Sequence, residues 1–221
     1  MKNWDNPKFI SFEGGEGSGK STQSKKLYEY LLSKDIKVIH TREVGGTKEA
    51  EQIRNLLIHQ HLYNVSELML VMAARYEHIN NLIIPALREG YTVICDRFVD
   101  STASYQAGDH LTIEDVFDLH NKLMRASDDH KVVMPDITFF MDLKPQIGIK
   151  RSIQTGDINK FEEKNISFHQ GVYERFKIIA SMYRDRIKTI SCENKEIEDI
   201  HQEILSLINQ VQYRDRNTNS C

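Results

Sequence analysis

Cysteine is scarce in this sequence of 221 residues, and its three copies stand far apart. They are Cys95, Cys192 and Cys221, and none belongs to a Cys-x-x-Cys pair. This number and spacing suggest neither a disulfide framework nor a structural zinc site. The pattern is typical of a protein from a reducing compartment.

Long apolar runs and basic blocks are also missing. The longest apolar run, Leu68–Ala74, is too short to span a bilayer, and residues 1–7 contain no apolar signal core. The chain has 29 Lys plus Arg against 32 Asp plus Glu, a formal net charge of -3. We therefore expect a cytoplasmic protein without a membrane or nucleic-acid partner. A local cluster of positive charge around a phosphate site is still compatible with this balance.

Short apolar runs alternate with helical patterns along the whole chain. Predicted strands occupy residues 9–12, 37–40, 92–95, 137–141 and 187–191. Predicted helices occupy residues 20–33, 48–59, 66–88, 112–125, 145–154, 168–183 and 197–211. Within the longest helix, Pro85 should introduce a kink or end the regular part.

This alternation predicts an α/β fold built from parallel β-α-β units. The strands are apolar almost throughout, which predicts a sheet covered on both faces. We expect a five-stranded parallel sheet with helices on both faces, formed by a single domain of residues 1–213. Residues 214–221 should form a polar tail.

The strongest motif lies between the first predicted strand and the first predicted helix. Residues 14–21 match the pattern G-x-x-x-x-G-K-[ST] of the phosphate-binding loop, or P-loop. Glycines let successive backbone N–H groups turn toward phosphate oxygens, and the lysine adds a positive charge. The alternative is a glycine-rich turn that binds nothing. The residues expected to bind ATP are Gly14, Gly15, Glu16, Gly17, Ser18, Gly19, Lys20, Ser21 and Thr22.

Other P-loop classes fit the sequence less well. A switch GTPase needs a D-x-x-G motif, and no aspartate here is followed by glycine three residues later. Its N-K-x-D guanine motif has only a near match at residues 159–162, which ends in glutamate. DNA-handling ATPases are usually longer and carry basic surfaces. A small kinase is the remaining class, and it needs an acceptor phosphate site, a carboxylate near Mg²⁺ and a mobile cation.

Candidates for the acceptor site follow two predicted strands. Asp96 and Arg97 come after the third strand, where ligands bind in an open parallel sheet, and Arg97 can bind a phosphate in a bidentate manner. Arg42 follows the second strand and precedes the turn Gly45-Gly46. The structural alternatives are an ion pair between Asp96 and Arg97 and an ordinary surface loop at Arg42.

These residues belong to segments that resemble the thymidylate kinase (dTMP kinase) family, a group of P-loop nucleotide kinases, along nearly the whole chain. The segments that carry the resemblance are Phe12-Glu13-Gly14, Thr41-Arg42-Glu43, Gly45-Gly46-Thr47, Ala73-Ala74-Arg75, Asp96-Arg97-Phe98 with Ser101, Tyr105-Gln106, Pro135-Asp136, Asn159-Lys160-Phe161-Glu162 and Ile187-Lys188-Thr189-Ile190. The resemblance implies a P-loop kinase fold, a homodimer, and transfer of the γ-phosphoryl group of ATP to dTMP with Mg²⁺.

The resemblance also implies residue roles. The implied catalytic residues are Lys20, Asp96, Arg97, Arg151 and Glu43, with Glu43 near Mg²⁺ or the transferred group. The implied dTMP-binding residues are Arg42, Arg75, Arg97, Ser101, Thr102, Tyr105 and Gln106. Arg42 and Arg97 would hold the acceptor phosphate, Arg75 and Thr102 would read thymine, and Tyr105 would pack beneath the deoxyribose. Ser21 and Asp96 would serve Mg²⁺, and Arg151 and Lys160 would belong to a lid at about residues 145–165.

Three departures from the family pattern stand out. Val44 replaces a usual proline, and Val71 replaces a phenylalanine that usually stacks on thymine. Gly17 stands where one subgroup carries an arginine, so the lid would supply the transition-state cation, with Arg151 preferred to Lys160. Ile153 and Thr155 occupy lid positions that are often arginine.

Two alternatives to this function stay open, and one surface has two interpretations. The chain could be another nucleoside or nucleotide kinase on the same scaffold, because fold does not determine the substrate. It could also be a nucleotide-binding protein without turnover. Four residues of the long helix could form a dimer surface or belong to the core: Leu68, Met69, Met72 and Ile79.

Overall fold

The predicted parallel sheet is present in the computed structural model, which describes residues 8–108, 110–126, 131–155 and 164–218. All its strand pairs are parallel, in the order β2-β3-β1-β4-β5. The strands are β1 (Phe9–Glu13), β2 (Val38–Arg42), β3 (Thr92–Asp96), β4 (Ile137–Asp142) and β5 (Ile187–Ser191). The helix that connects β1 to β2 packs on one face of the sheet, and the helices that precede β4 pack on the other face. The strand order therefore reverses beside β1, and open parallel sheets bind ligands at such a point.

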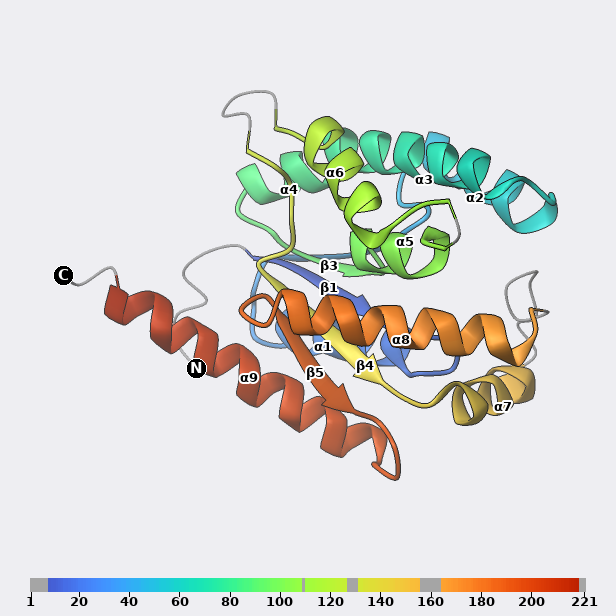
Figure 1. Cartoon of the computed structure of the whole chain (residues 1–221). Helices are drawn as coiled ribbons and strands as arrows, with labels where there is room; N and C mark the ends of the chain where they lie inside the picture. The colour runs from blue at the N-terminus through green and yellow to red at the C-terminus, as the bar shows by residue number, and fades with distance from the viewer. Residues whose placement is uncertain (1–7, 109, 127–130, 156–163, 219–221) are drawn as a thin grey trace.

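Helices cover both faces of the sheet, as the apolar strands predicted (Figure 1). The helices that follow the first strands are α1 (Lys20–Leu32), α2 (Lys48–His59), α3 (Asn64–His78), the π-helix η1 (Ile79–Ile83), α4 (Ile84–Arg88) and α5 (Val99–Gln106). The remaining helices are α6 (Ile113–Leu123), α7 (Pro145–Thr155), α8 (Ile166–Met182) and α9 (Ile197–Thr218).

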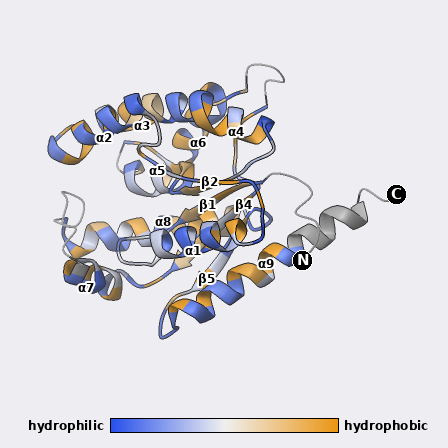
Figure 2. Cartoon of the chain, turned by 180° about the vertical axis from the view of Figure 1, so that it is seen from behind, coloured by the Kyte–Doolittle hydropathy of each residue, from blue (hydrophilic) through white to orange (hydrophobic). Residues whose placement is uncertain are grey.

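Two hydrophobic clusters, one on each side of the sheet, form the core. One cluster joins the sheet to α3, η1, α4, α5, α6 and α8 and includes Phe9, Met72, Phe98, Phe140 and Phe176. The other joins it to α1 and α9 and includes Phe12, Leu27, Phe139, Ile190 and Ile204. Figure 2 shows the helices with hydrophilic and hydrophobic residues on different sides, as expected for amphipathic helices around a covered sheet.

The long helix differs in detail from its prediction. It runs from Asn64 to Arg88, but a π-helical segment interrupts it at Ile79–Ile83, just before Pro85. Proline has no N–H to donate, so the hydrogen-bond pattern changes at this point, as expected for Pro85.

Of the two interpretations of the four residues on this helix, a dimer surface or core packing, the structure confirms core packing for three. Leu68, Met72 and Ile79 are 2%, 3% and 1% exposed and belong to the core, whereas Met69 is 51% exposed. The helical spacing of these side chains was correct, but spacing alone does not say which face of a helix meets the sheet.

Two further differences concern helices α5 and α9. Helix α5 was not predicted, because its sequence VDSTASYQ has no apolar stripe and nearly all its residues are buried. Helix α9 continues to Thr218, so the tail expected from residue 214 is helical over most of its length. Within the described part of the chain, no helix is both long and apolar enough to cross a membrane.

Candidate active site

The phosphate-binding loop joins β1 to α1, as the motif predicted. Gly17 and Gly19 have φ angles of 64° and 92°, in the left-handed region that glycine adopts without steric cost. Gly19 directly precedes α1, so the loop ends on the N-terminus of a helix, where backbone N–H groups favour an anion. Lys20 begins that helix, and its Nζ donates a hydrogen bond to the carbonyl of Gly15 at 3.3 Å.

Asp96 and Arg97 lie at the carboxyl end of β3, beside the start of this loop. The register pairs Asp96 with Phe12 of β1, and the N–H of Arg97 donates to the Phe12 carbonyl at 2.9 Å. Arg97 has φ of 72°, which is uncommon for a residue with a side chain. Its guanidinium donates to Gly14 O at 3.0 Å and to Ser101 Oγ at 3.1 Å. Arg97 is therefore bound to the phosphate loop itself.

Glu16 of the phosphate loop completes this connection. Its carboxylate accepts hydrogen bonds from Arg97 at 2.9 Å and from the Tyr105 hydroxyl at 2.7 Å, and it lies 3.7 Å from Lys20 Nζ. Burial alone would raise the pKa of Glu16, but the charges of Arg97 and Lys20 outweigh it and lower the pKa to about 2. The Arg97 guanidinium also stacks on the Tyr105 ring, 5.1 Å from its centroid.

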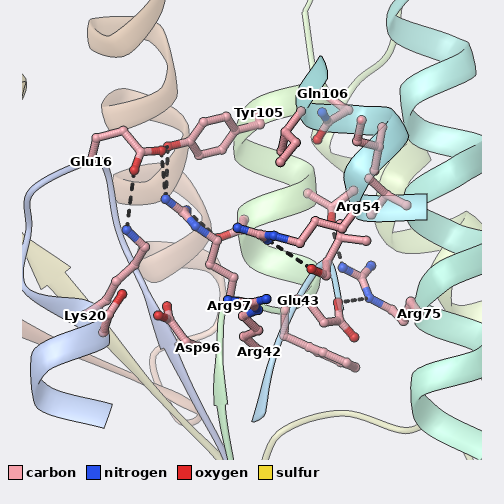
Figure 3. A pocket seen from close by; sticks show the side chains of 18 residues that line it. Glu16, Lys20, Arg42, Glu43, Arg54, Arg75, Asp96, Arg97, Tyr105 and Gln106 are labelled. Atoms are coloured by element: carbon pink, nitrogen blue, oxygen red, sulfur yellow. Dashed lines mark hydrogen bonds and ion pairs between the residues drawn. The ribbon is translucent and has the colours of Figure 1, made fainter. Parts of the chain in front are cut away.

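A cavity of about 390 Å³ opens between the phosphate loop, β2, β3, α2, α3 and α5. Figure 3 shows Lys20 and Asp96 on one side of the cavity and Arg75 and Gln106 on the other, with the guanidinium of Arg97 beside Glu16 on the side of Lys20. The sequence-predicted residues that line this cavity are Glu16, Lys20, Ser21, Arg42, Glu43, Arg75, Asp96, Arg97, Ser101, Thr102, Tyr105 and Gln106. Residues from distant parts of the sequence thus meet at one edge of the sheet.

Hydrogen bonds to two oxygen acceptors and a ring contact hold Arg75 at the far end of the cavity. Its Nε donates to Glu43 Oε2 at 2.7 Å, and its Nη2 donates to Thr102 Oγ1 at 2.6 Å. Its guanidinium carbon lies 4.8 Å from the centroid of the Phe98 ring. The side chain is 1% exposed, yet it lines the cavity, so its position is set by protein contacts before a ligand arrives.

Glu43 has partners different from those that the resemblance implied. Both of its carboxylate oxygens are engaged by Arg75 and His78 rather than turned toward the phosphate loop. Burial alone would raise the pKa of Glu43, but the charge of Arg75 and the hydrogen bond from His78 lower it, so the carboxylate stays ionised. This geometry assigns Glu43 to the organisation of Arg75.

Arg42 lines the cavity from the end of β2. Its Nη2 pairs with Glu51 Oε2 at 3.0 Å, and its side chain is 53% exposed. Glu51 also accepts a hydrogen bond from the Gly46 N–H at 3.1 Å. An exposed pair of this kind costs little to separate, so Arg42 can exchange a carboxylate for a phosphate ligand.

Sequence reasoning missed Arg54 of α2, which also lines the cavity. Its Nη1 donates to the Val44 carbonyl at 3.0 Å, and burial together with the charge of Arg42 lowers its pKa. A signal was available, because Arg54 shares a helix face with Ala50 and Leu57, both of which are buried. The hydrogen bond from Arg54 to the Val44 carbonyl shows that this face is turned toward the loop that follows β2.

Helix α7, at the base of the predicted lid, contacts the phosphate loop closely. A Cβ added to Gly148 would lie 2.2 Å from the Glu16 carbonyl oxygen, and one added to Gly17 would lie 1.9 Å from the Gly148 carbonyl oxygen. Arg151 lies one turn further along α7, is exposed and does not line the cavity. Lys160 lies outside the described residues.

The residues predicted to serve Mg²⁺ fit that ion. Asp96 Oδ1 is buried and accepts no hydrogen bond from the described residues, and Ser21 lines the same cavity. Among the described residues there is no group of three or more His, Cys, Asp or Glu side chains placed to hold a metal. Mg²⁺ bound with a nucleotide uses one or two carboxylates, phosphate oxygens and water, so one free carboxylate oxygen beside the loop suits it.

Comparison with known proteins gives one consistent family. A family model described as thymidylate kinase matches residues 12–204. A thymidylate kinase of Rickettsia canadensis is 48% identical over 206 residues, which cover 91% of this chain and 97% of that protein. One from Rickettsia bellii is 46% identical over 204 residues, with coverage of 92% and 96%. The crystal structure of thymidylate kinase from Ehrlichia chaffeensis is similar with a TM-score of 0.73 and 34% identity, covering 92% of this chain and 99% of that one. The chain belongs to the thymidylate kinase family.

Proposed function

We propose that this protein is a kinase that transfers the γ-phosphoryl group of ATP to dTMP, giving dTDP and ADP. One observation carries the proposal. A single cavity is lined by Lys20 of the phosphate loop and by Arg42, Arg97 and Arg75. The Lys20 ammonium suits the phosphates of the donor. The three arginines suit the phosphate of a second nucleotide and the polar edge of its base. Family membership supports the same reaction and substrate.

The donor would be bound by residues 14–22. The backbone N–H groups of the loop and the N-terminus of α1 would surround the β- and γ-phosphates, and Lys20 would add its charge. Asp96 and Ser21 would hold Mg²⁺, which when bound neutralises charge that develops on the phosphate oxygens. Asp96 Oδ1 supports this role because it is buried without a hydrogen-bond partner among the described residues.

The acceptor would lie between β2, β3 and α5. Arg97 and Arg42 would bind the phosphate of dTMP, with Ser101 orienting Arg97 from 3.1 Å. Tyr105 would pack beneath the deoxyribose. Arg75 and Thr102 would face polar edges of thymine at the far end, with Gln106 close by. Phosphoryl transfer requires little covalent participation by the protein, so positioning and charge neutralisation are sufficient.

Three further parts complete the proposal: the lid, the oligomeric state and the location. Arg151 and Lys160 would close over ATP as lid residues, with Arg151 the preferred transition-state cation because α7 is docked on the phosphate loop. A homodimer is proposed from family membership. A cytoplasmic location is proposed because Cys95 and Cys192 are buried free thiols, as expected in a reducing compartment.

The test is turnover with a panel of nucleoside monophosphates. The protein is mixed with MgATP and dTMP, dUMP, AMP, GMP, CMP or UMP, and release of ADP is followed. Turnover confined to dTMP and close analogues such as dUMP supports the proposal. A preference for AMP or GMP would instead indicate a related nucleotide kinase, and no monophosphate-dependent ADP release would indicate a binding protein without turnover.

A further inference from the structure

We infer that His78 is a positioning residue for the acceptor site, acting through Glu43 on Arg75 and through Thr41 on the loop that follows Arg42. The inference rests on the proposed function, because it concerns the half of the cavity assigned to dTMP. His78 does not line that cavity and lies behind its wall. Any effect it has on an acceptor must therefore pass through other side chains.

Both nitrogens of the His78 ring have a partner, and the side chain is 0% exposed. Nδ1 lies 3.0 Å from Glu43 Oε1, and Nε2 lies 2.8 Å from Thr41 Oγ1. An ionised carboxylate can only accept hydrogen bonds, so Nδ1 donates to Glu43. In the neutral ring Nε2 then accepts from the Thr41 hydroxyl, which fixes the tautomer and the orientation of the imidazole.

The Glu43 carboxylate connects this imidazole to Arg75. Oε1 accepts from His78, and Oε2 accepts from Arg75 Nε at 2.7 Å. A carboxylate held at both oxygens cannot rotate, so the Arg75 guanidinium has one preferred orientation. The Thr102 hydroxyl on the other side of Arg75 completes the alignment. Without His78, Glu43 would keep its charge pair with Arg75 but lose the bond that fixes its angle.

The same imidazole also supports the loop that follows Arg42. A Cβ added to Gly46 would lie 2.5 Å from His78 Nε2 and 2.6 Å from Thr41 Oγ1, so the Gly46 backbone rests directly on the ring. The Gly46 N–H donates to Glu51, the carboxylate that pairs with Arg42. One buried side chain is thus linked through Glu43 to Arg75, which is assigned to the base, and through Thr41 and Gly46 to the loop after Arg42, which is assigned to the phosphate.

The experiment replaces His78 with phenylalanine, which keeps a ring of similar size but can make neither hydrogen bond. We expect the KM for dTMP to rise about tenfold or more, as for other residues that orient a ligating side chain, while the KM for ATP changes less than about twofold. His78→Asn places an amide nitrogen near the position of Nδ1, so it should restore much of the affinity for dTMP. This rescue would not follow from loss of packing alone.

Two controls keep the inference testable. His201 of α9 is a buried histidine on the opposite face of the sheet, and His201→Phe should leave both KM values unchanged. If His78→Phe does not fold, as judged by thermal unfolding, Thr41→Val and Glu43→Gln each remove one link of the same chain and should each raise the KM for dTMP selectively. An unchanged KM for dTMP in folded His78→Phe, or equal increases for both substrates, would overturn the inference.

This outcome can be separated from failure of the proposed function. The wild-type protein is first tested with the monophosphate panel. If its acceptor is a different monophosphate, the proposed function is wrong, and the KM for that acceptor then tests His78 in the same way. If wild type uses dTMP and the variants behave like wild type, the function stands and the role of His78 is wrong.

Discussion

The Arg97 guanidinium donates a hydrogen bond to the Glu16 carboxylate at 2.9 Å, which joins the end of β3 to the phosphate loop. The same guanidinium donates to the Gly14 carbonyl at 3.0 Å. Since Arg97 is the residue proposed to bind the acceptor phosphate, this contact would place the acceptor directly beside the donor loop. In-line transfer requires that proximity of the two phosphates.

We predict that Arg97→Lys lowers kcat/KM for dTMP by about 100-fold. Lysine keeps the positive charge but cannot make the separate hydrogen bonds to Gly14, Glu16 and Ser101. The charge would therefore no longer be held in position for the acceptor phosphate. Steady-state kinetics with varied dTMP measure the effect. Kinetics within about twofold of wild type would show that Arg97 does not bind the acceptor.

We predict that Lys20→Ala lowers kcat by about 1000-fold without unfolding the protein, because Lys20 acts on phosphate charge in the transition state. Lys25 lies on the same helix with a side chain that is 69% exposed, so Lys25→Ala is a matched control with unchanged kcat. Turnover and thermal unfolding are measured for both. Near-normal kcat in Lys20→Ala would contradict its phosphate role.

Tyr105→Ala should reduce the preference for deoxyribose over ribose by about tenfold, because the ring that would exclude a 2′-hydroxyl is gone. Burial raises the pKa of the Tyr105 phenol, which therefore stays protonated and donates to Glu16. Tyr105→Phe removes that donor but keeps the ring, so it should preserve the sugar preference. The measurement compares kcat/KM for dTMP and for ribothymidine monophosphate, and equal discrimination in all three proteins would refute the assignment.

Glu13→Gln should become more stable relative to wild type as pH rises. Burial and the nearby charge of Asp100 raise the pKa of Glu13 from its ordinary 4.5 to about 8. Between these values the folded state holds a proton that the unfolded state has lost, so this group contributes stability at low pH that is lost as pH rises toward 8. Glutamine can accept from the Phe98 N–H and donate to Ser101, and it does not titrate.

The measurement is the free energy of unfolding of both proteins in denaturant at several values from about pH 5 to about pH 8.5. The difference between variant and wild type should change by on the order of 1 kcal/mol or more over this window. Arg97, Arg186 and Asp100 face Glu13 in both proteins, so their titration largely cancels. A difference that is independent of pH would show that Glu13 is ionised throughout.

Gly148→Ala should raise the KM for ATP and lower the thermal unfolding temperature by a few degrees. The added Cβ would lie 2.2 Å from the Glu16 carbonyl oxygen, so α7 or the phosphate loop must shift. Gly171→Ala in α8 is a matched control, because both changes gain helix propensity while the second Cβ meets only the flexible Arg175 side chain at 3.2 Å. Equal behaviour of the two variants would show that the close contact at Gly148 does not matter.

The strands, the phosphate loop and most of the cavity lining were predictable from the sequence. An apolar strand is a local pattern, and the phosphate loop is a run of contiguous residues, so neither depends on distant parts of the chain. Asp96 and Arg42 could also be placed together, since the carboxyl ends of neighbouring parallel strands meet at one edge of a sheet. The family resemblance added the substrate and the site residues beyond these two loops, among them Arg75, Thr102 and Tyr105.

The partners of the buried charges were decided only by the tertiary structure. Glu43 was expected near Mg²⁺ or the transferred phosphoryl group, but its partners are Arg75 and His78, which lie 32 and 35 residues away in the sequence. Glu13 contacts Phe98 and Ser101, which are 85 and 88 residues away in the sequence, and no local sequence pattern predicts such pairs. A buried carboxylate must take whichever donors the packed helices bring to it, because leaving it unpaired away from water is too costly. The sequence by itself therefore determined which groups could act on phosphates, and the packing of α3 and α5 on the sheet decided which of them hold the others in place.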